Sequence, residues 1–219
     1  MKAIDLFRIN YQRAEELLNT HKNAFPRGRP STKGAGDDLL RSVVVFAAAA
    51  LDAYLSMRVI QVTKEICFRK NRFPEMAVDY FEKKHGDKAI RNLLNIAVSN
   101  DPLKYLMKSL EKSIMGTTFQ SPEQVTKALS IMEITDPWLK LDKEIIPTRG
   151  VKKKGKKPTC KVFLSEFIDR RNDIVHGGDV YISDKYHGKL KPINRVWVDQ
   201  SIKKLEKMVL GIEKISQIT

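Results

Sequence analysis

The chain has 219 residues, enough for one domain with an ordinary hydrophobic core, and its 42% hydrophobic and 30% charged content is typical of soluble globular proteins. Its two cysteines, Cys67 and Cys160, exclude a disulfide framework and a Cys/His metal site, so a reducing cytoplasm is expected. The net charge of +14 favours a polyanionic partner, most often nucleic acid, and simple solubility is the alternative explanation.

Two helices joined by a loop rich in glycine and proline are predicted first in chain order. Residues 4–21 form an amphipathic pattern. Its apolar candidates are Leu6, Ile9, Ala14, Leu17 and Leu18. After the loop at 25–36, two aspartates offer an N-cap and an acidic first turn to a long helix over 37–70. Its centre, 43–51, is apolar all round but too short to span a membrane, and it predicts a buried core helix. The charged N-terminus does not read as a signal peptide, so no membrane association is expected.

Shorter helices follow in the middle of the chain. They are predicted over residues 74–84, 88–98, 102–114 and 121–134. The last of these has the clearest beginning, because Ser121 can cap it and Pro122 suits the first helical position. A short segment of unassigned form begins at Asp136.

The C-terminal part of the chain holds one more helix at 161–176, an irregular stretch at 179–196 and a final amphipathic helix. The irregular stretch is expected to contain a small hairpin around residues 180–182 and 195–197. Asp199 is the expected N-cap of the final helix. The residues of that helix expected to face inward are Ile202, Leu205, Val209, Ile212 and Ile215. The pattern predicts a single all-α domain, a helical bundle with an irregular insertion before the C-terminal helix.

An arginine on an apolar stripe marks the helix over 161–176. The stripe consists of Leu164, Phe167, Ile168, Ile174 and Val175. Arg171 lies on it, His176 follows five residues later, and Gly177-Gly178 then ends the helix. A cation among apolar residues is unfavourable unless it has a partner or a task. The motif from Arg171 to His176 is therefore the first candidate for chemistry.

The residue types of this motif suit cleavage of RNA without a metal. The 2′-hydroxyl attacks the neighbouring phosphate, which requires a base, an acid and a cation at the developing charge. Five residues along a helix turn the chain by about 140°, so Arg171 and His176 do not share one face. Asn172 does share a face with His176, and Asn172 or Asp173 could orient its ring. A dimer would bring two copies of the motif into one cleft and supply both acid and base. The alternative is a structural ion pair between Arg171 and Asp52.

A strongly basic segment precedes the motif helix. Its cations are Arg149, Lys152, Lys153, Lys154, Lys156 and Lys157. With glycines at 150 and 155, it is expected to form an exposed loop that follows RNA phosphates. Neither a glycine-rich phosphate loop nor a metal-binding cluster is evident, so no cofactor and no metal are expected.

Three segments of the chain resemble one family. The sequence RNDIVHG from Arg171 resembles the signature of the HEPN superfamily: an arginine, four to six residues and a histidine, often with a polar residue after the arginine. Residues 40–55 (LRSVVVFAAAALDAYL) resemble the long helix of its RiboL-PSP type, and 119–129 (FQSPEQVTKAL) with 136–138 resemble the middle of that family. The resemblance covers about 37–219, which leaves the helix and loop of 1–36 outside it.

The resemblance implies a dimeric helical bundle with two motifs in one cleft, and an activity as a metal-independent endoribonuclease in toxin–antitoxin or anti-phage systems. Arg171 would bind the scissile phosphate, His176 would be the general acid and base, and Asn172 would tune them. Arg170 also falls within the allowed spacing, but Arg171 is preferred because it lies on the stripe and precedes Asn172. Asp52, in the long helix, is a weaker supporting residue.

Two other interpretations stay open beside this one. Some HEPN proteins do not cleave RNA, so a non-catalytic RNA-binding or protein-interaction module is the alternative. An antitoxin or a protein of a defence system is an expected further partner.

Overall fold

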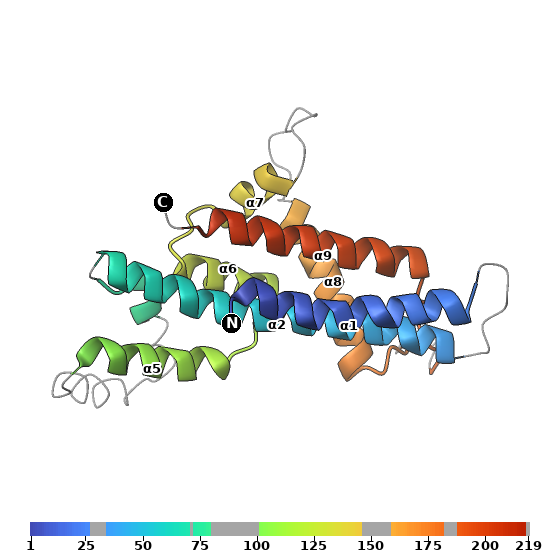
Figure 1. Ribbon diagram of the computed structural model, residues 1–219. Coiled ribbons are helices and arrows are strands. Elements are labelled where there is room, and N and C mark those ends of the chain that lie inside the picture. The colour runs from blue at the N-terminus through green and yellow to red at the C-terminus, as the bar shows by residue number, and fades with distance from the viewer. Residues whose placement is uncertain (27–33, 71, 80–100, 146–158, 182–187, 218–219) are drawn as a thin grey trace.

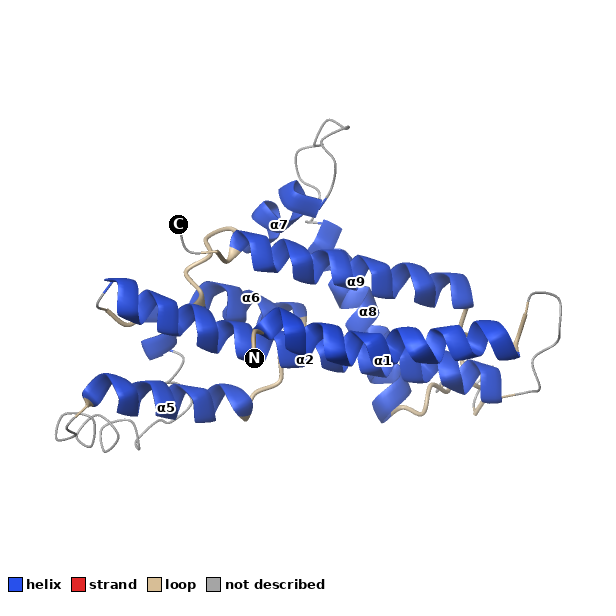
Figure 2. Ribbon diagram, in the orientation of Figure 1, coloured by secondary structure: helices blue, strands red, loops and turns tan. Residues whose placement is uncertain are grey.

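The computed structural model describes residues 1–26, 34–70, 72–79, 101–145, 159–181 and 188–217 (Figure 1). These residues are mostly helices joined by short loops (Figure 2). The helices are α1 (Ala3–Ala24), α2 (Ala35–Lys70), α5 (Pro102–Met115), α6 (Pro122–Ile131), α7 (Pro137–Ile145), α8 (Thr159–His176) and α9 (Arg195–Ile215). A further helical turn covers 75–79. The all-α prediction is confirmed.

Helix α2 is the centre of the bundle. It contacts α1, α5, α6, α8 and α9, and α1 runs antiparallel along it (Figure 1). The apolar segment predicted from the sequence supplies the contact: Val43, Val44, Ala47, Ala48, Ala50 and Leu51 are buried. The small alanine side chains allow neighbouring backbones to approach closely, which is why the most apolar stretch of the sequence lies where most helices meet.

By length and composition alone, α2 could also cross a membrane, and it is the one helix of the described residues that could. In the bundle, 61% of its most apolar stretch is buried against other helices. This burial is what the core helix of a helical bundle requires, because a fully apolar surface must be covered by other elements.

The face predicted for helix α1 is confirmed only in part, since Ala14 and Leu18 are buried as expected and Ile9 is not. The side chains turned toward the bundle are Ala3, Phe7, Tyr11, Ala14, Leu18 and His21. Ile9, an expected core residue, is 57% exposed, whereas Leu17 packs at the edge of the core. The aromatic rings decide this rotation, because Phe7 stacks on Tyr11 and meets the edge of Tyr54 on α2.

Helices α5 and α6 begin at the residues that the sequence indicates, whereas the helix predicted over 88–98 lies outside the described residues. Ser121 caps α6, its hydroxyl accepting a hydrogen bond from the Gln124 N–H at 3.2 Å. The helix ends at Ile131, three residues earlier than expected. Glu133 then adopts a left-handed conformation (φ 59°), and the Ile134 N–H returns to the Leu129 carbonyl. The segment left unassigned at Asp136 is the beginning of α7.

Two predictions near the C-terminus are wrong. Asn194, not Asp199, caps α9, since its side chain accepts hydrogen bonds from the first N–H groups of the helix. Asp199 lies within α9 and binds Lys22 at 2.8 Å and Lys203 at 2.6 Å. A small antiparallel pairing exists, but it joins residues 179–181 to 188–191, while 195–197 form the first turn of α9. The inward face predicted for the last helix is confirmed, with Ile202, Leu205, Val209 and Ile212 buried and Ile215 packed against the core.

Candidate active site

Helix α8 is anchored at its N-terminal end and middle, and its last turn emerges from the bundle. The carboxylate of Asp142 on α7 accepts hydrogen bonds from the N–H groups of Thr159 and Cys160, which caps the helix. Further along, Phe167 is fully buried and stacks on Trp197 of α9. Val175, an expected member of the buried stripe, is 44% exposed. Ile174, also expected on the stripe, is partly buried and packs against the core, so the stripe ends after Ile174 and the last turn of α8 passes from core to surface.

Arg171 is half-buried and has no acidic partner among the described residues. Its Nη1 donates a hydrogen bond to the neighbouring Asn172 Oδ1 at 3.1 Å. Its Nε is buried and has no hydrogen-bond partner within the described chain. A buried N–H without an acceptor is unfavourable by about 1–3 kcal/mol, so this guanidinium is held in a site that does not satisfy it.

The adjacent Arg170 is also half-buried but differs from Arg171 in its binding partners. Its guanidinium forms an ion pair with the fully buried carboxylate of Asp179, at 2.5 and 2.8 Å, and also donates to the Pro192 carbonyl at 3.1 Å. Arg170 thus closes the turn after α8 onto the helix. Arg171, unlike Arg170, has no carboxylate partner among the described residues, and the preference for it as the phosphate-binding candidate stays a prediction.

His176 is the last residue of α8 and is exposed. Its imidazole has no hydrogen-bond or ion-pair partner among the described residues. The helix ends there because Gly178 takes a left-handed conformation (φ 59°), while the N–H groups of Gly177 and Asp179 both return to the Asp173 carbonyl. Among the described residues, therefore, only the backbone of α8 positions the exposed imidazole.

A comparison with known protein families agrees with the all-α fold. The family model described as RiboL-PSP-HEPN matches residues 9–215. The chain belongs to the RiboL-PSP-HEPN family. The match begins within α1, earlier than the boundary at residue 37 expected from the resemblance. HEPN domains in general are ribonuclease-type or nucleotide-binding modules. Neither a curated protein nor a solved structure matches the chain.

The supporting residues expected around the HEPN motif are engaged elsewhere. Asp173 binds the ammonium group of Lys191 at 2.5 Å and does not reach the imidazole. Asn172 is occupied by Arg171, so neither of the two candidates orients the ring of His176 in this structure. Asp52 accepts hydrogen bonds from the Phe119 N–H at 2.6 Å and from the Gln120 amide at 3.1 Å. These contacts fix the segment before α6, and the alternative ion pair between Asp52 and Arg171 is not formed.

The basic segment with Lys152, Lys153, Lys154, Lys156 and Lys157 lies outside the described residues. Its two ends are defined, since α7 stops at Ile145 and α8 starts at Thr159 under the Asp142 cap. Within the described part of the chain, no group of three or more His, Cys, Asp or Glu side chains could hold a metal ion.

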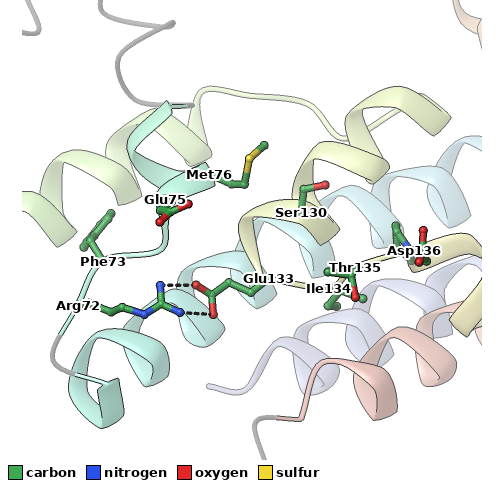
Figure 3. Close-up of a pocket in the computed structure, with 10 residues that line it drawn as sticks. Arg72, Phe73, Glu75, Met76, Ser130, Glu133, Ile134, Thr135 and Asp136 are labelled. Carbon is green, nitrogen blue, oxygen red and sulfur yellow. Dashed lines mark hydrogen bonds and ion pairs between the residues drawn. The ribbon is translucent and has the colours of Figure 1, made fainter.

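A hollow away from the HEPN motif lies between the end of α2 and the turn from α6 to α7 (Figure 3). Its volume is about 670 Å³, and Phe73, Met76 and Ile134 contribute apolar lining. On its wall, Arg72 and Glu133 form a two-point ion pair, which lowers the pKa of the Glu133 carboxyl. Among its lining residues there is no histidine, so the hollow lacks the combination of an arginine and a histidine that the motif on α8 offers.

Sequence reasoning missed one residue of this region. Asp179 had been assigned to an irregular stretch, yet its side chain is 0% exposed and binds two arginines. Its position directly after Gly177-Gly178 was the available signal, because Asp tolerates the left-handed conformation (φ 57°) that such a turn requires. No local sequence feature identifies Arg41 on α2 as a partner of Asp179.

Proposed function

We propose that the protein is a metal-independent endoribonuclease that acts as a homodimer, with Arg171 and His176 at its active site. The observation that carries the proposal is the half-buried Arg171, which has no acidic partner among the described residues and lies five residues before an exposed histidine at the end of the same helix. The other buried or half-buried arginines of α2 and α8, Arg41, Arg58 and Arg170, each bind a carboxylate. A guanidinium left without a carboxylate is suited to an incoming phosphate, which it can grip with two parallel hydrogen bonds.

The roles of the two residues follow from the chemistry of RNA cleavage. The 2′-oxygen of a ribose attacks the adjacent phosphorus, the bond to the 5′-oxygen breaks, and the products are a 2′,3′-cyclic phosphate and a 5′-hydroxyl. Arg171 stabilises the negative charge that grows on the phosphate oxygens. Histidine side chains titrate near neutrality, so His176 can accept the proton of the 2′-hydroxyl or donate one to the leaving oxygen.

One motif supplies one histidine, and two histidines in one cleft would provide acid and base together. The surface around the motif supports a dimer of this kind, because Val175 is 44% exposed and Leu190 on the neighbouring hairpin is 49% exposed. Homodimer interfaces are more apolar than the rest of a protein surface, so a dimer of this kind would cover these two side chains. Asn172, already bound to Arg171, would hold the guanidinium toward the shared cleft.

The biological setting of this activity is part of the proposal. RNA in the cytoplasm is the substrate, and the two free, buried cysteines suit that compartment. We assign the protein to host-shutoff toxins or anti-phage effectors, with an antitoxin or defence protein as its regulating partner. The lysines at 152–157 would add sequence-independent affinity for RNA phosphates.

A non-catalytic RNA-binding or protein-interaction module is the second candidate. The observation that favours it is the His176 imidazole, which has no orienting hydrogen bond within the described residues. This candidate predicts RNA binding that weakens with salt, and no cleavage.

Product chemistry tests the proposal. Wild-type protein and a single-stranded RNA are incubated in chelator, and the new ends are identified; we expect 2′,3′-cyclic phosphate and 5′-hydroxyl ends. A substrate with one 2′-deoxyribose at the main cleavage site should remain intact at that site. Glu166→Gln, an exposed change on the same helix, is the matched control for His176→Ala. Cleavage at the deoxy position, or equal cleavage by His176→Ala and the control, contradicts the proposal.

A further inference from the structure

A buried cluster of one aspartate and two arginines lies directly behind the motif. Asp179 comes three residues after His176, and its side chain is fully buried. Its carboxylate accepts a hydrogen bond from Arg41 Nε at 2.6 Å and from Arg170 Nη2 at 2.8 Å. Arg41 belongs to the central helix α2 and Arg170 to α8, so the carboxylate ties the turn after α8 to two helices at once.

The backbone of Asp179 is equally engaged. Its N–H donates to the Asp173 carbonyl at 2.9 Å, and its carbonyl accepts from the Lys191 N–H at 2.6 Å. Arg41 extends the cluster by donating from Nη2 to the Lys191 carbonyl at 2.9 Å. The turn of residues 177–179 is therefore held between α8, α2 and the hairpin strand at 188–191.

This attachment bears on His176 because no other contact within the described part of the chain fixes the imidazole. The side chain has no partner in the described residues, so the direction of the ring depends on the backbone of the last turn of α8. On a regular helix, Arg171 and His176 point about 140° apart. Small changes in the last turn then decide whether both side chains reach one phosphate, and a displacement of about 1 Å can lower a catalytic rate by about a hundredfold.

We propose that Asp179, clamped by Arg41 and Arg170, is a positioning residue that holds the last turn of α8 so that His176 and Arg171 act on the same phosphate. The inference rests on the proposed ribonuclease function. It gives Arg170 a task distinct from that of Arg171: Arg170 fixes the turn, and its guanidinium stays bound to Asp179 and away from the substrate.

The test uses Asp179→Asn in the full-length protein. Asparagine keeps the size of the side chain and tolerates the left-handed backbone, but it presents an N–H to one of the two guanidinium groups. We expect the single-turnover cleavage rate at saturating RNA to fall by about tenfold or more, with the Kd for a non-cleavable RNA changed less than about twofold. In the His176→Ala background, Asp179→Asn should cause no further loss.

Arg58→Gln is the matched control. Arg58 lies on the same helix as Arg41, is equally buried at 6% exposure, and also binds an acidic residue, Glu213, but far from the motif. The Arg58→Gln substitution should lower the free energy of unfolding without slowing RNA cleavage by the folded protein. If Asp179→Asn does not fold, Arg41→Lys tests the clamp from the α2 side. A wild-type rate in the clamp variant, or an equal slowing in Arg58→Gln, overturns the positioning role.

Amide hydrogen exchange separates this inference from the proposed function. In Asp179→Asn the Gly177 N–H, which donates to the Asp173 carbonyl, should exchange about tenfold faster than in the wild type. An unchanged Gly177 exchange rate overturns the clamp whether or not the protein cleaves RNA. Faster exchange in a protein whose wild type cleaves no RNA keeps the clamp and overturns the ribonuclease function.

Discussion

Replacing each of two neighbouring arginines by alanine should have different effects on stability. Arg170 and Arg171 are adjacent on α8 and chemically identical, but one is bound to a buried carboxylate and the other has no acidic partner in the described residues. Arg170→Ala and Arg171→Ala therefore form a matched pair. The two variants together show whether Arg171 contributes to stability or to RNA cleavage.

The structure gives rough magnitudes for both variants. Arg170→Ala removes one of two cations from the buried Asp179; breaking such a pair usually costs about 3–5 kcal/mol, and since Arg41 remains bound we expect about 2–4 kcal/mol. Arg171→Ala loses the packing of a half-buried stem, about 1 kcal/mol, and removes a buried Nε without an acceptor, which regains about 1–3 kcal/mol. Its net effect should lie within about 1 kcal/mol of zero or be stabilising.

Urea denaturation followed by circular dichroism measures both free energies of unfolding. If the same variants are unfolded by heat, a change of about 1 kcal/mol corresponds to a shift of roughly 2–4 °C in Tm for a chain of this size. We expect Arg170→Ala to unfold at a clearly lower urea concentration than the wild type. Arg171→Ala should unfold at the same urea concentration as the wild type and should not cleave RNA. The reasoning is refuted if Arg171→Ala is destabilised as much as Arg170→Ala, because Arg171 would then be a structural residue.

Further predictions follow from other buried groups. Burial and a neighbouring arginine lower the pKa of His21, so stability should be lost as pH falls below about 6.5; urea midpoints at pH 7.5 and 5.5 should differ more in the wild type than in His21→Phe. Asp52→Ala should lower the free energy of unfolding by about 1–3 kcal/mol, because two hydrogen-bond donors lose their acceptor, while cleavage per folded molecule is unchanged; a selective loss of activity would contradict this. Burial raises the pKa of the Cys67 and Cys160 thiols, so neither should react with a disulfide reagent until urea unfolds the chain. Rapid labelling of the native protein would contradict this prediction, because it would show that the thiols are accessible.

Much of the fold could be predicted from the sequence because its strongest signals are local. The run at 43–51 is apolar on every side and can be satisfied only at the centre of a bundle, which is where α2 lies. Ser121 and Pro122 mark the start of α6 by a side-chain hydrogen bond and a fixed backbone angle, both of which depend on neighbouring residues alone. The motif helix was recognisable because its signals, the spacing from Arg171 to His176 and the following Gly177-Gly178, are local as well.

The errors arise where distant parts of the chain compete with local preference. Residues 195–197 resemble a strand by composition, yet Trp197 stacks on Phe167 of α8 and the segment is helical. On α1, Ile9 was expected in the core but is 57% exposed, because the aromatic contacts of Phe7 with Tyr11 and Tyr54 are made on another side of the helix. The partner of Asp179 could not be read from the sequence, because Arg41 lies 138 residues away.

The most direct test of the account is the rate at which the protein cleaves RNA in the presence of chelator, measured under single-turnover conditions for the wild type and for His176→Ala. The account predicts cleavage by the wild type that leaves cyclic phosphate ends, and a rate in the folded variant lower by about a hundredfold or more. Cleavage by His176→Ala at the wild-type rate would contradict the assignment of the active site, and an intact RNA with both proteins would favour the non-catalytic module.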